Sequence, residues 1–141
     1  MPSLRLAAPA VLALFAFAGP ALAGPPTGYY RQPAIHMDTI VFVSEGDLWK
    51  VSVAGGAATR LTTHPGEEGL PAISPDGKTV AFTAAYEGPS AVYVMPLAGG
   101  LPRRLTFDEG SVSFVGWTPD GRLLYSTDSH SGLPDEQLVV L

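Results

Sequence analysis

The 141-residue sequence contains no cysteine and few basic residues. Without cysteine the chain has no disulfide, thiolate metal site, cysteine nucleophile or lipid anchor on a cysteine. Its 13 Asp and Glu residues outnumber its 8 Lys and Arg residues, and no basic cluster is longer than Arg103-Arg104. Because nucleic-acid binding depends on clustered positive charge, the composition argues against that function.

Long hydrophobic runs are also missing, except at the N-terminus. Residues 1–23 have the pattern of a secretory signal peptide: Arg5 is followed by the apolar run Leu6–Ala18 and by the small-residue cleavage site Ala-Leu-Ala at 21–23. This run is shorter than the about 20 residues that span a bilayer. We expect a signal helix, cleavage after Ala23 and export to the periplasm or the medium. A retained membrane anchor is the alternative.

Three copies of one unit follow a Pro-rich linker at residues 24–28. Gly-Gly at 55, Arg-Leu-Thr at 60 and Pro-Asp-Gly at 75 each recur 44 positions later, at 99, 104 and 119. A repeat of about 40–45 residues with four strands is typical of a β-propeller blade. We therefore predict an all-β fold, a partial β-propeller of about three four-stranded antiparallel blades of the WD type. The predicted blades are about 29–66, about 67–110 and an incomplete one at about 111–141.

The turn residues and apolar runs predict where the strands lie. Pro75-Asp76-Gly77 suits a hairpin turn, and each Gly pair favours a tight turn between strands. The run Ile40–Val43 is apolar on both faces, which fits a sheet packed between neighbouring sheets. We expect Trp49 to pack between blades. Strands are predicted near 33–36, 39–44, 47–53, 58–62, 71–74, 79–85, 91–97, 102–106, 113–117 and 122–127, with another within Gln137–Leu141.

The number of blades is smaller than a closed propeller needs. Closed propellers have typically 4–8 blades of about 40 residues each. We therefore expect a truncated propeller, with a small self-contained β-sheet domain as the alternative. His36-Met37-Asp38 occupies the place of the turn at Ser74–Gly77 in the next unit. Met37 is bulky for a turn position at which a positive φ is expected.

Two polar loops carry the candidate site residues. His64 with Glu67 and Glu68 suggests a metal site only weakly, because no second histidine lies nearby; a solvated connection between blades is the simpler interpretation. Asp108-Glu109 occupies the corresponding loop of the next unit. Asp128, His130 and Ser131 invite a triad interpretation, but side chains this close on one loop seldom reach triad geometry. We predict no catalytic, metal or cofactor-binding residue in the chain.

Several strings together resemble one family. The leader GYYR-PAIH, the string EGDLWKV and the loop LTTHPGEEG occur in the order found at the start of the N-terminal propeller of Tricorn-type proteases. The unit SPDGKTVAFT…VYVMPLAGG…RRLT is less specific: it is also similar to the TolB propeller and to propellers fused to prolyl oligopeptidases and amidohydrolases. The resemblance covers Gly28–Leu141. Met37 departs from it, since the family pattern has Gly there.

The resemblance implies a parent serine peptidase that acts on oligopeptides. In that family the N-terminal propeller gates or filters substrates, and the catalytic residues lie far downstream, so none can be carried over to this sequence. The implied partners are peptides or proteins that bind the complete propeller, and oligomers are expected of the full-length parent. The alternative is an exported, TolB-like, non-enzymatic protein-binding propeller; propellers fused to other hydrolases come third.

Overall fold

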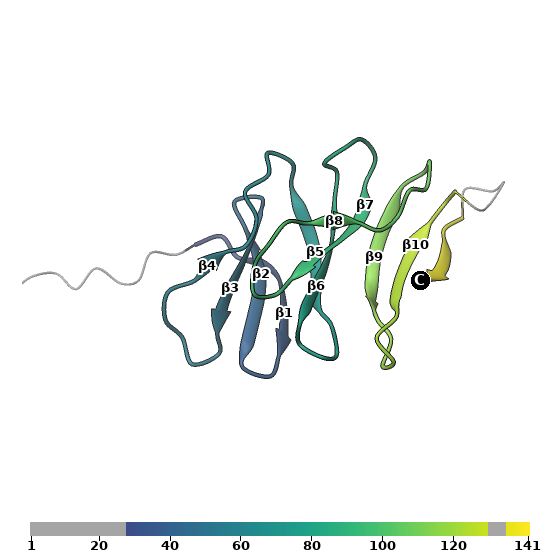
Figure 1. Cartoon of the computed structure of the whole chain (residues 1–141). Coiled ribbons are helices and arrows are strands. Elements are labelled where there is room, and N and C mark those ends of the chain that lie inside the picture. The colour runs from purple at the N-terminus through teal and green to yellow at the C-terminus, as the bar shows by residue number, and fades with distance from the viewer. Residues whose placement is uncertain (1–27, 130–134) are drawn as a thin grey trace, which may run out of the picture.

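The computed structural model describes residues 28–129 and 135–141, and the regular structure in these ranges is all β (Figure 1). The all-β prediction is confirmed. The predicted signal helix, its cleavage site and nearly all of the linker lie outside the described residues. Within the described ranges, no helix is long and apolar enough to cross a membrane.

The strands form three antiparallel sheets, and within each sheet they follow one another in chain order. The first sheet consists of β1 (Arg31–His36), β2 (Thr39–Ser44), β3 (Asp47–Ser52) and β4 (Thr59–Arg60). The second consists of β5 (Glu68–Ile73), β6 (Thr79–Ala84), β7 (Ala91–Pro96) and β8 (Arg103–Arg104). The third consists of β9 (Val112–Trp117), β10 (Leu123–Thr127) and β11 (Gln137–Val140). Four-stranded sheets repeated in series are the blades of a propeller, so the prediction of a partial β-propeller is confirmed.

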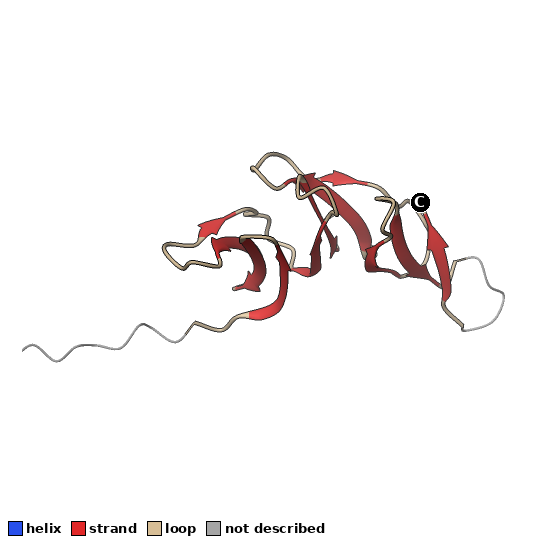
Figure 2. Ribbon diagram, turned by 90° about the horizontal axis from the view of Figure 1, so that it is seen from below, coloured by secondary structure: helices blue, strands red, loops and turns tan. Residues whose placement is uncertain are grey.

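The three sheets stand side by side in a row (Figures 1 and 2). The first strands of successive sheets approach one another, since β1 contacts β5 and β5 contacts β9. The fourth strands β4 and β8 make their main contacts inside their own sheets, with β3 and β7. The first strands therefore form the inner edge of the row, and the fourth strands form its outer edge.

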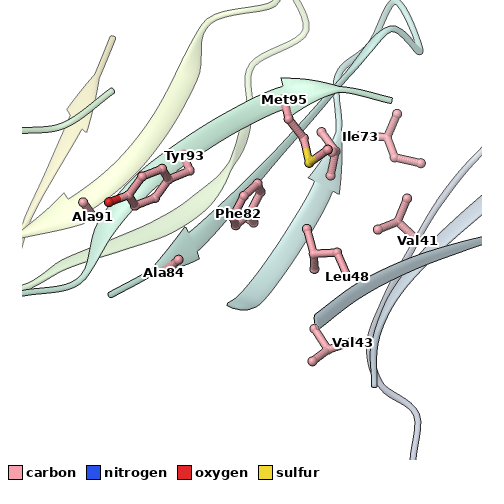
Figure 3. Packing of buried hydrophobic residues seen from close by; sticks show 10 residues of the cluster. Val41, Val43, Leu48, Ile73, Phe82, Ala84, Ala91, Tyr93 and Met95 are labelled. Carbon is pink, nitrogen blue, oxygen red and sulfur yellow. The ribbon is translucent and has the colours of Figure 1, made fainter. Parts of the chain in front are cut away.

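An apolar layer joins the first sheet to the second. Figure 3 shows side chains of both sheets pointing toward one another. The buried set comprises Val41, Val43, Leu48, Ile73, Val80, Phe82, Ala84, Ala91, Tyr93 and Met95. Burial of a large apolar side chain such as the fully buried Phe82 contributes about 1.5–3 kcal/mol. This layer therefore holds the two sheets together.

A second apolar layer joins the second sheet to the third. Its buried members are Ala81, Val92, Val94, Val112, Phe114, Leu123 and Tyr125. Because successive side chains of a strand point to opposite faces, β6 supplies Phe82 to one layer and Ala81 to the other. Trp117 adds a hydrogen bond between the sheets, from its Nε1 to the carbonyl oxygen of Ala72 at 3.0 Å. The expectation that a strand apolar on both faces lies between neighbouring sheets is confirmed for β6; for β2, the described sheets cover only the face that carries Val41 and Val43.

Trp49 lies in neither layer, so its predicted place between blades is wrong for the sheets that the structure describes. It pairs across the strands with Phe42, on the face of the first sheet opposite to the buried Leu48. Its Nε1 donates to the carbonyl oxygen of Ser44 at 3.2 Å, and the Arg60 guanidinium lies 5.8 Å from the centroid of the indole ring. The alternation of side chains along β3 sends Leu48 and Trp49 to opposite faces.

The fourth strands are two residues long, shorter than predicted. The N–H groups of Leu48 and Val92 donate to the side-chain oxygens of Thr62 and Thr106, at 2.8 and 2.9 Å, in place of a backbone carbonyl. A threonine hydroxyl thus ends each backbone ladder. The prediction ended the strands at these threonines, two residues too late, because a side-chain acceptor of this kind has no signature in hydrophobic periodicity.

The glycine pairs do not form tight two-residue turns, contrary to the prediction. Gly55 N–H donates to the carbonyl oxygen of Ser52, and Gly99 N–H donates to that of Pro96, both at 2.9 Å. Each glycine pair therefore closes a β-turn inside a longer connection between the third and fourth strands. Both pairs have positive φ, between 88° and 147°, which explains why glycine recurs there.

Candidate functional site

The inner edge of the row forms a surface to which all three sheets contribute, and we call it the inner wall. It contains a groove of about 300 Å³ lined by Gln32, Pro33, Leu70, Pro71, Ala72, Phe114 and Val115. These residues come from β1, β5 and β9, and none of their side chains carries a charge. Such a wall offers apolar contacts to an extended chain, but it supplies no general acid, base or nucleophile.

Two β-bulges shape the inner wall. The pairing of β1 with β2 and of β5 with β6 shifts register around Gln32 and Leu70, and these residues have φ of 49° and 50°. The N–H of Leu70 donates to Gln32 Oε1 at 2.8 Å, which joins the two bulges. A non-glycine residue in this left-handed conformation costs about 1–3 kcal/mol. Bulges redirect side chains, and here Leu70 remains 41% exposed on the wall.

Buried polar side chains form a second feature, the polar junction of Asp47, Arg60, Thr62, Glu68 and Tyr86, between the first two sheets. Asp47, Thr62 and Glu68 are each at most 4% exposed. Arg60 pairs with Asp47, the Tyr86 hydroxyl donates to Glu68 Oε1, and the Thr62 hydroxyl donates to Glu68 Oε2 at 3.0 Å. These bonds satisfy the buried groups, so the junction fixes the first sheet against the second.

The electrostatics of the polar junction are set by burial. Burial raises the pKa of Glu68, and the nearby Asp47 carboxylate acts in the same direction. The hydrogen bonds from Tyr86 and Thr62 oppose this rise, as does Arg60. Burial and the Glu68 carboxylate also raise the pKa of the Tyr86 hydroxyl, which therefore remains a proton donor at neutral pH.

The structure does not bring His64, Glu67 and Glu68 together as metal ligands. Glu68 belongs to the polar junction, whereas His64 stacks on Tyr86 with ring centroids 3.8 Å apart and accepts a hydrogen bond at Nδ1 from Gly66 N–H. Among the described residues, no three His, Asp or Glu side chains are placed to hold a metal ion. The interpretation of a solvated connection is wrong for Glu68, because β5 begins at this residue and buries it.

The carboxylate pair Glu67–Glu68 has no counterpart at Asp108–Glu109, contrary to the prediction. The spacing of 44 positions continues through the connection, so that β5 begins at Glu68 and β9 begins at Val112. Val112 is therefore the equivalent of Glu68, and the second pair of sheets meets through an apolar residue at this point. Asp108 instead matches His64, and it raises the pKa of Tyr125 in addition to the effect of burial.

The triad candidates are only partly described. Asp128 directly follows β10, while His130 and Ser131 lie outside the described residues. The interpretation of this segment as a polar loop rather than a triad stays a prediction.

The propeller-like fold agrees with a comparison to protein families. Residues 27–140 match the model of the Tricorn protease N-terminal beta propeller domain. The chain belongs to this family. The family suggested by the sequence motifs is thereby confirmed.

Individual relatives of this Tricorn-family chain support the assignment. Tricorn protease homolog 1 of Streptomyces coelicolor is 40% identical over 69 residues, which cover 49% of this chain and 6% of that protein. The crystal structure of the tricorn protease matches with a TM-score of 0.65 and 26% identity over 72% of this chain and 11% of that one. TolB from Acinetobacter baumannii matches with a TM-score of 0.68 and 26% identity over 80% of this chain and 29% of that one. This chain thus spans only a small part of the length of the proteins it matches.

Sequence reasoning missed the two features that the Tricorn-family fold builds from distant residues. Gln32 and Leu70 carry no glycine or asparagine signal for a positive φ, so the inner-wall bulges were invisible in the sequence. Asp47 was correctly predicted to begin the third strand, but nothing in the sequence near it indicates that its side chain is buried and paired with Arg60. A weak signal for the polar junction existed, since Arg60 and Thr62 belong to the repeated Arg-Leu-Thr motif.

Proposed function

We propose that the chain is the N-terminal propeller of an exported Tricorn-like serine peptidase and that it admits oligopeptides to a catalytic domain encoded downstream. The match of residues 27–140 to the Tricorn propeller family carries this proposal. Relatives of this chain are named as proteases. Under this proposal the peptidase activity belongs to another part of the complete protein, as the family resemblance implies.

The inner wall supports a role in admitting peptides. Its groove is lined by uncharged residues from three successive sheets, so it can contact extended peptides along their length. A surface without charge discriminates little between acidic and basic peptides, and the bulges fix how far Leu70 projects from it. Width and apolarity, rather than charge, then determine which peptides pass.

The first test is the DNA beyond codon 141 together with the activity of the complete gene product. The proposal expects further blades followed by a PDZ-like segment and a Tricorn-type protease core, and hydrolysis of oligopeptides by the purified product. A reading frame that encodes a complete propeller and then stops would contradict it.

A TolB-like protein-binding propeller is the second candidate, and the fold match to TolB over 80% of the chain favours it. Under this alternative the reading frame stops after about six blades, within the usual range for closed propellers. The purified product then binds protein partners and hydrolyses no peptide.

A further inference from the structure

The two repeated arginines of the outer edge have different partners. Arg60 pairs with the buried carboxylate of Asp47. Arg104 stands 44 positions later in the same motif, but the residue equivalent to Asp47 is Ala91. The acidic contact of Arg104 is instead with Glu87, at 3.7 Å from guanidinium nitrogen to carboxylate oxygen, and the Glu87 side chain is 73% exposed. The second sheet therefore has the arginine of the motif but lacks the buried carboxylate that pairs with it in the first sheet.

The protein nevertheless holds the Arg104 guanidinium in place. Its Nε donates to the carbonyl oxygen of Thr106 at 2.7 Å, and its Cζ lies over the Phe107 ring, 5.2 Å from the ring centroid. The side chain is 17% exposed. One edge of the guanidinium is thus used to fix its position, and the terminal nitrogen Nη1 makes only the 3.7 Å contact with the exposed Glu87. A guanidinium held in this way binds a carboxylate with little loss of conformational entropy.

Arg104 lines a groove between the segment that leaves β4 and the residues around β8. The groove has a volume of about 480 Å³, and Tyr86 and Tyr93 contribute aromatic surface to it. His64 is a second donor in its lining. Because His64 Nδ1 accepts a hydrogen bond from Gly66 N–H, the proton of the neutral imidazole sits on Nε2. Two nitrogen donors therefore lie in one groove.

Large apolar side chains stand exposed next to these donors. Leu101, in the lining of the groove, is 90% exposed, and Phe107, beneath the guanidinium, is 76% exposed. Arginine and aromatic residues beside exposed apolar ones are typical of surfaces that bind other chains. The apolar flanks favour a peptide segment over a free small anion, which would leave Leu101 and Phe107 uncovered.

We propose that this groove docks an acidic peptide segment, with a glutamate or aspartate side chain that displaces Glu87 and pairs with Arg104 and His64. Apolar residues on either side of that acid cover Leu101 and Phe107. The groove lies toward the outer edge, whereas the inner wall lies at the inner edge, so the two surfaces can hold different chains. This docking does not depend on the proposed peptidase function.

Titration of the 141-residue chain with one peptide series tests this. The probe is an acetylated and amidated hexapeptide with a single central glutamate flanked by leucine and proline. A second peptide carries glutamine in its place, and a third is the glutamine peptide with a free C-terminal carboxylate. Binding is measured by calorimetry for the unchanged chain, for Arg104→Gln and for the control Arg103→Gln, a neighbouring arginine of β8 that does not line the groove.

We expect the glutamate peptide to bind the unchanged chain at least about tenfold more tightly than the glutamine peptide. Arg104→Gln should abolish that preference, and Arg103→Gln should keep it. Equal binding of the glutamate and glutamine peptides to the unchanged chain overturns the proposal, and this comparison needs no folded variant. So does an equal loss in both arginine variants, which would indicate general charge attraction. A preference for the free C-terminus alone would assign the groove to chain ends and overturn the proposal as well.

Discussion

At the scale of single residues, the first and second hairpins differ in the residue that takes a positive φ at the turn. Met37 has φ of 50° and is 83% exposed, so its side chain gains little from packing while its backbone is strained. The sequence-based doubt about Met37 at this turn is confirmed. The second sheet has Gly77 in the corresponding loop, with φ of 71°.

Met37→Gly should raise the free energy of unfolding. The left-handed conformation costs a non-glycine residue about 1–2 kcal/mol, and the extra freedom of glycine in the unfolded chain offsets part of this. We expect a net gain of about 0.5–1 kcal/mol in urea denaturation. Gly77→Ala is the opposite control: a Cβ there would lie 3.1 Å from His36 Cδ2 at a positive φ, so stability should fall. A lower free energy of unfolding in Met37→Gly would contradict this and show that the Met37 side chain stabilises the folded state.

The buried Glu68 makes the stability of the polar junction depend on pH. Its pKa is raised in the folded chain, so the folded state binds this proton more tightly than the unfolded state does. The resulting contribution to stability is complete below the ordinary glutamate pKa and is lost as the pH rises through the folded value. Acidification from neutral pH toward the ordinary glutamate pKa should therefore raise the free energy of unfolding.

Glu68→Gln should remove that pH dependence. Glutamine is neutral at every pH. Its amide oxygen can accept the hydrogen bond from Tyr86, and its NH2 group can donate to the Thr62 hydroxyl, so the variant should gain stability at neutral pH relative to the unchanged chain. Urea denaturation at several pH values between 4 and 8, chosen around the ordinary carboxyl range, measures this. Glu67→Gln changes the neighbouring carboxylate outside the junction and should keep the dependence. An unaltered pH profile in Glu68→Gln would refute the assignment to Glu68.

At the scale of elements, a threonine hydroxyl closes each of the first two sheets. Thr62 and Thr106 accept hydrogen bonds from the third strands at equivalent positions, and both are buried. Only Thr62 also donates to Glu68. Comparison of the two threonines therefore isolates the hydrogen bond from Thr62 to Glu68.

Thr106→Val should lower the free energy of unfolding by about 1–3 kcal/mol, because the buried N–H of Val92 loses its acceptor. Thr62→Val should cost more, since Glu68 also loses a donor. Urea denaturation of both variants at neutral pH gives the comparison. Equal effects would show that the bond from Thr62 to Glu68 contributes nothing to stability.

The local sequence pattern predicted most strands well. It failed where contacts between residues far apart in the sequence determine the structure. The apolar runs of β2 and β6 stand between clear turns, so their predicted bounds differ from the structure by at most one residue. β5 begins at Glu68, three residues before the predicted start, because the bulge at Leu70 interrupts the alternation. The inner wall and the polar junction could not be predicted, since each joins residues from different sheets that no local motif connects.

In the third sheet, a first hairpin that is one residue shorter changes which residues of β10 face the second sheet. Its first hairpin closes with a bond from Thr118 N–H to the carbonyl oxygen of Arg122, and the matching bond in the second sheet spans one residue more. A shift of one residue exchanges the two faces of a strand. Leu123 and Tyr125 therefore face the second sheet, although the spacing of 44 positions alone would place their neighbours there.

At the scale of the whole molecule, export remains a prediction from residues 1–23. Cleavage after Ala23 would start the mature chain at Gly24. N-terminal sequencing of protein recovered from the periplasm or the medium should therefore read Gly-Pro-Pro-Thr-Gly. Recovery of the chain with an intact Met1 from the cytosol would contradict export.

The passage of peptides along the inner wall is the central claim for the complete protein. Leu70→Trp enlarges a side chain that projects from this wall, and Val53→Trp is the control on an exposed connection after β3. The most direct measurement is kcat/KM of the complete gene product for an oligopeptide and for a single-residue chromogenic substrate. We predict that Leu70→Trp lowers kcat/KM for the oligopeptide by roughly tenfold and leaves the small substrate unchanged, while Val53→Trp affects neither. Equal rates for the oligopeptide in Leu70→Trp and the unchanged protein would contradict the claim.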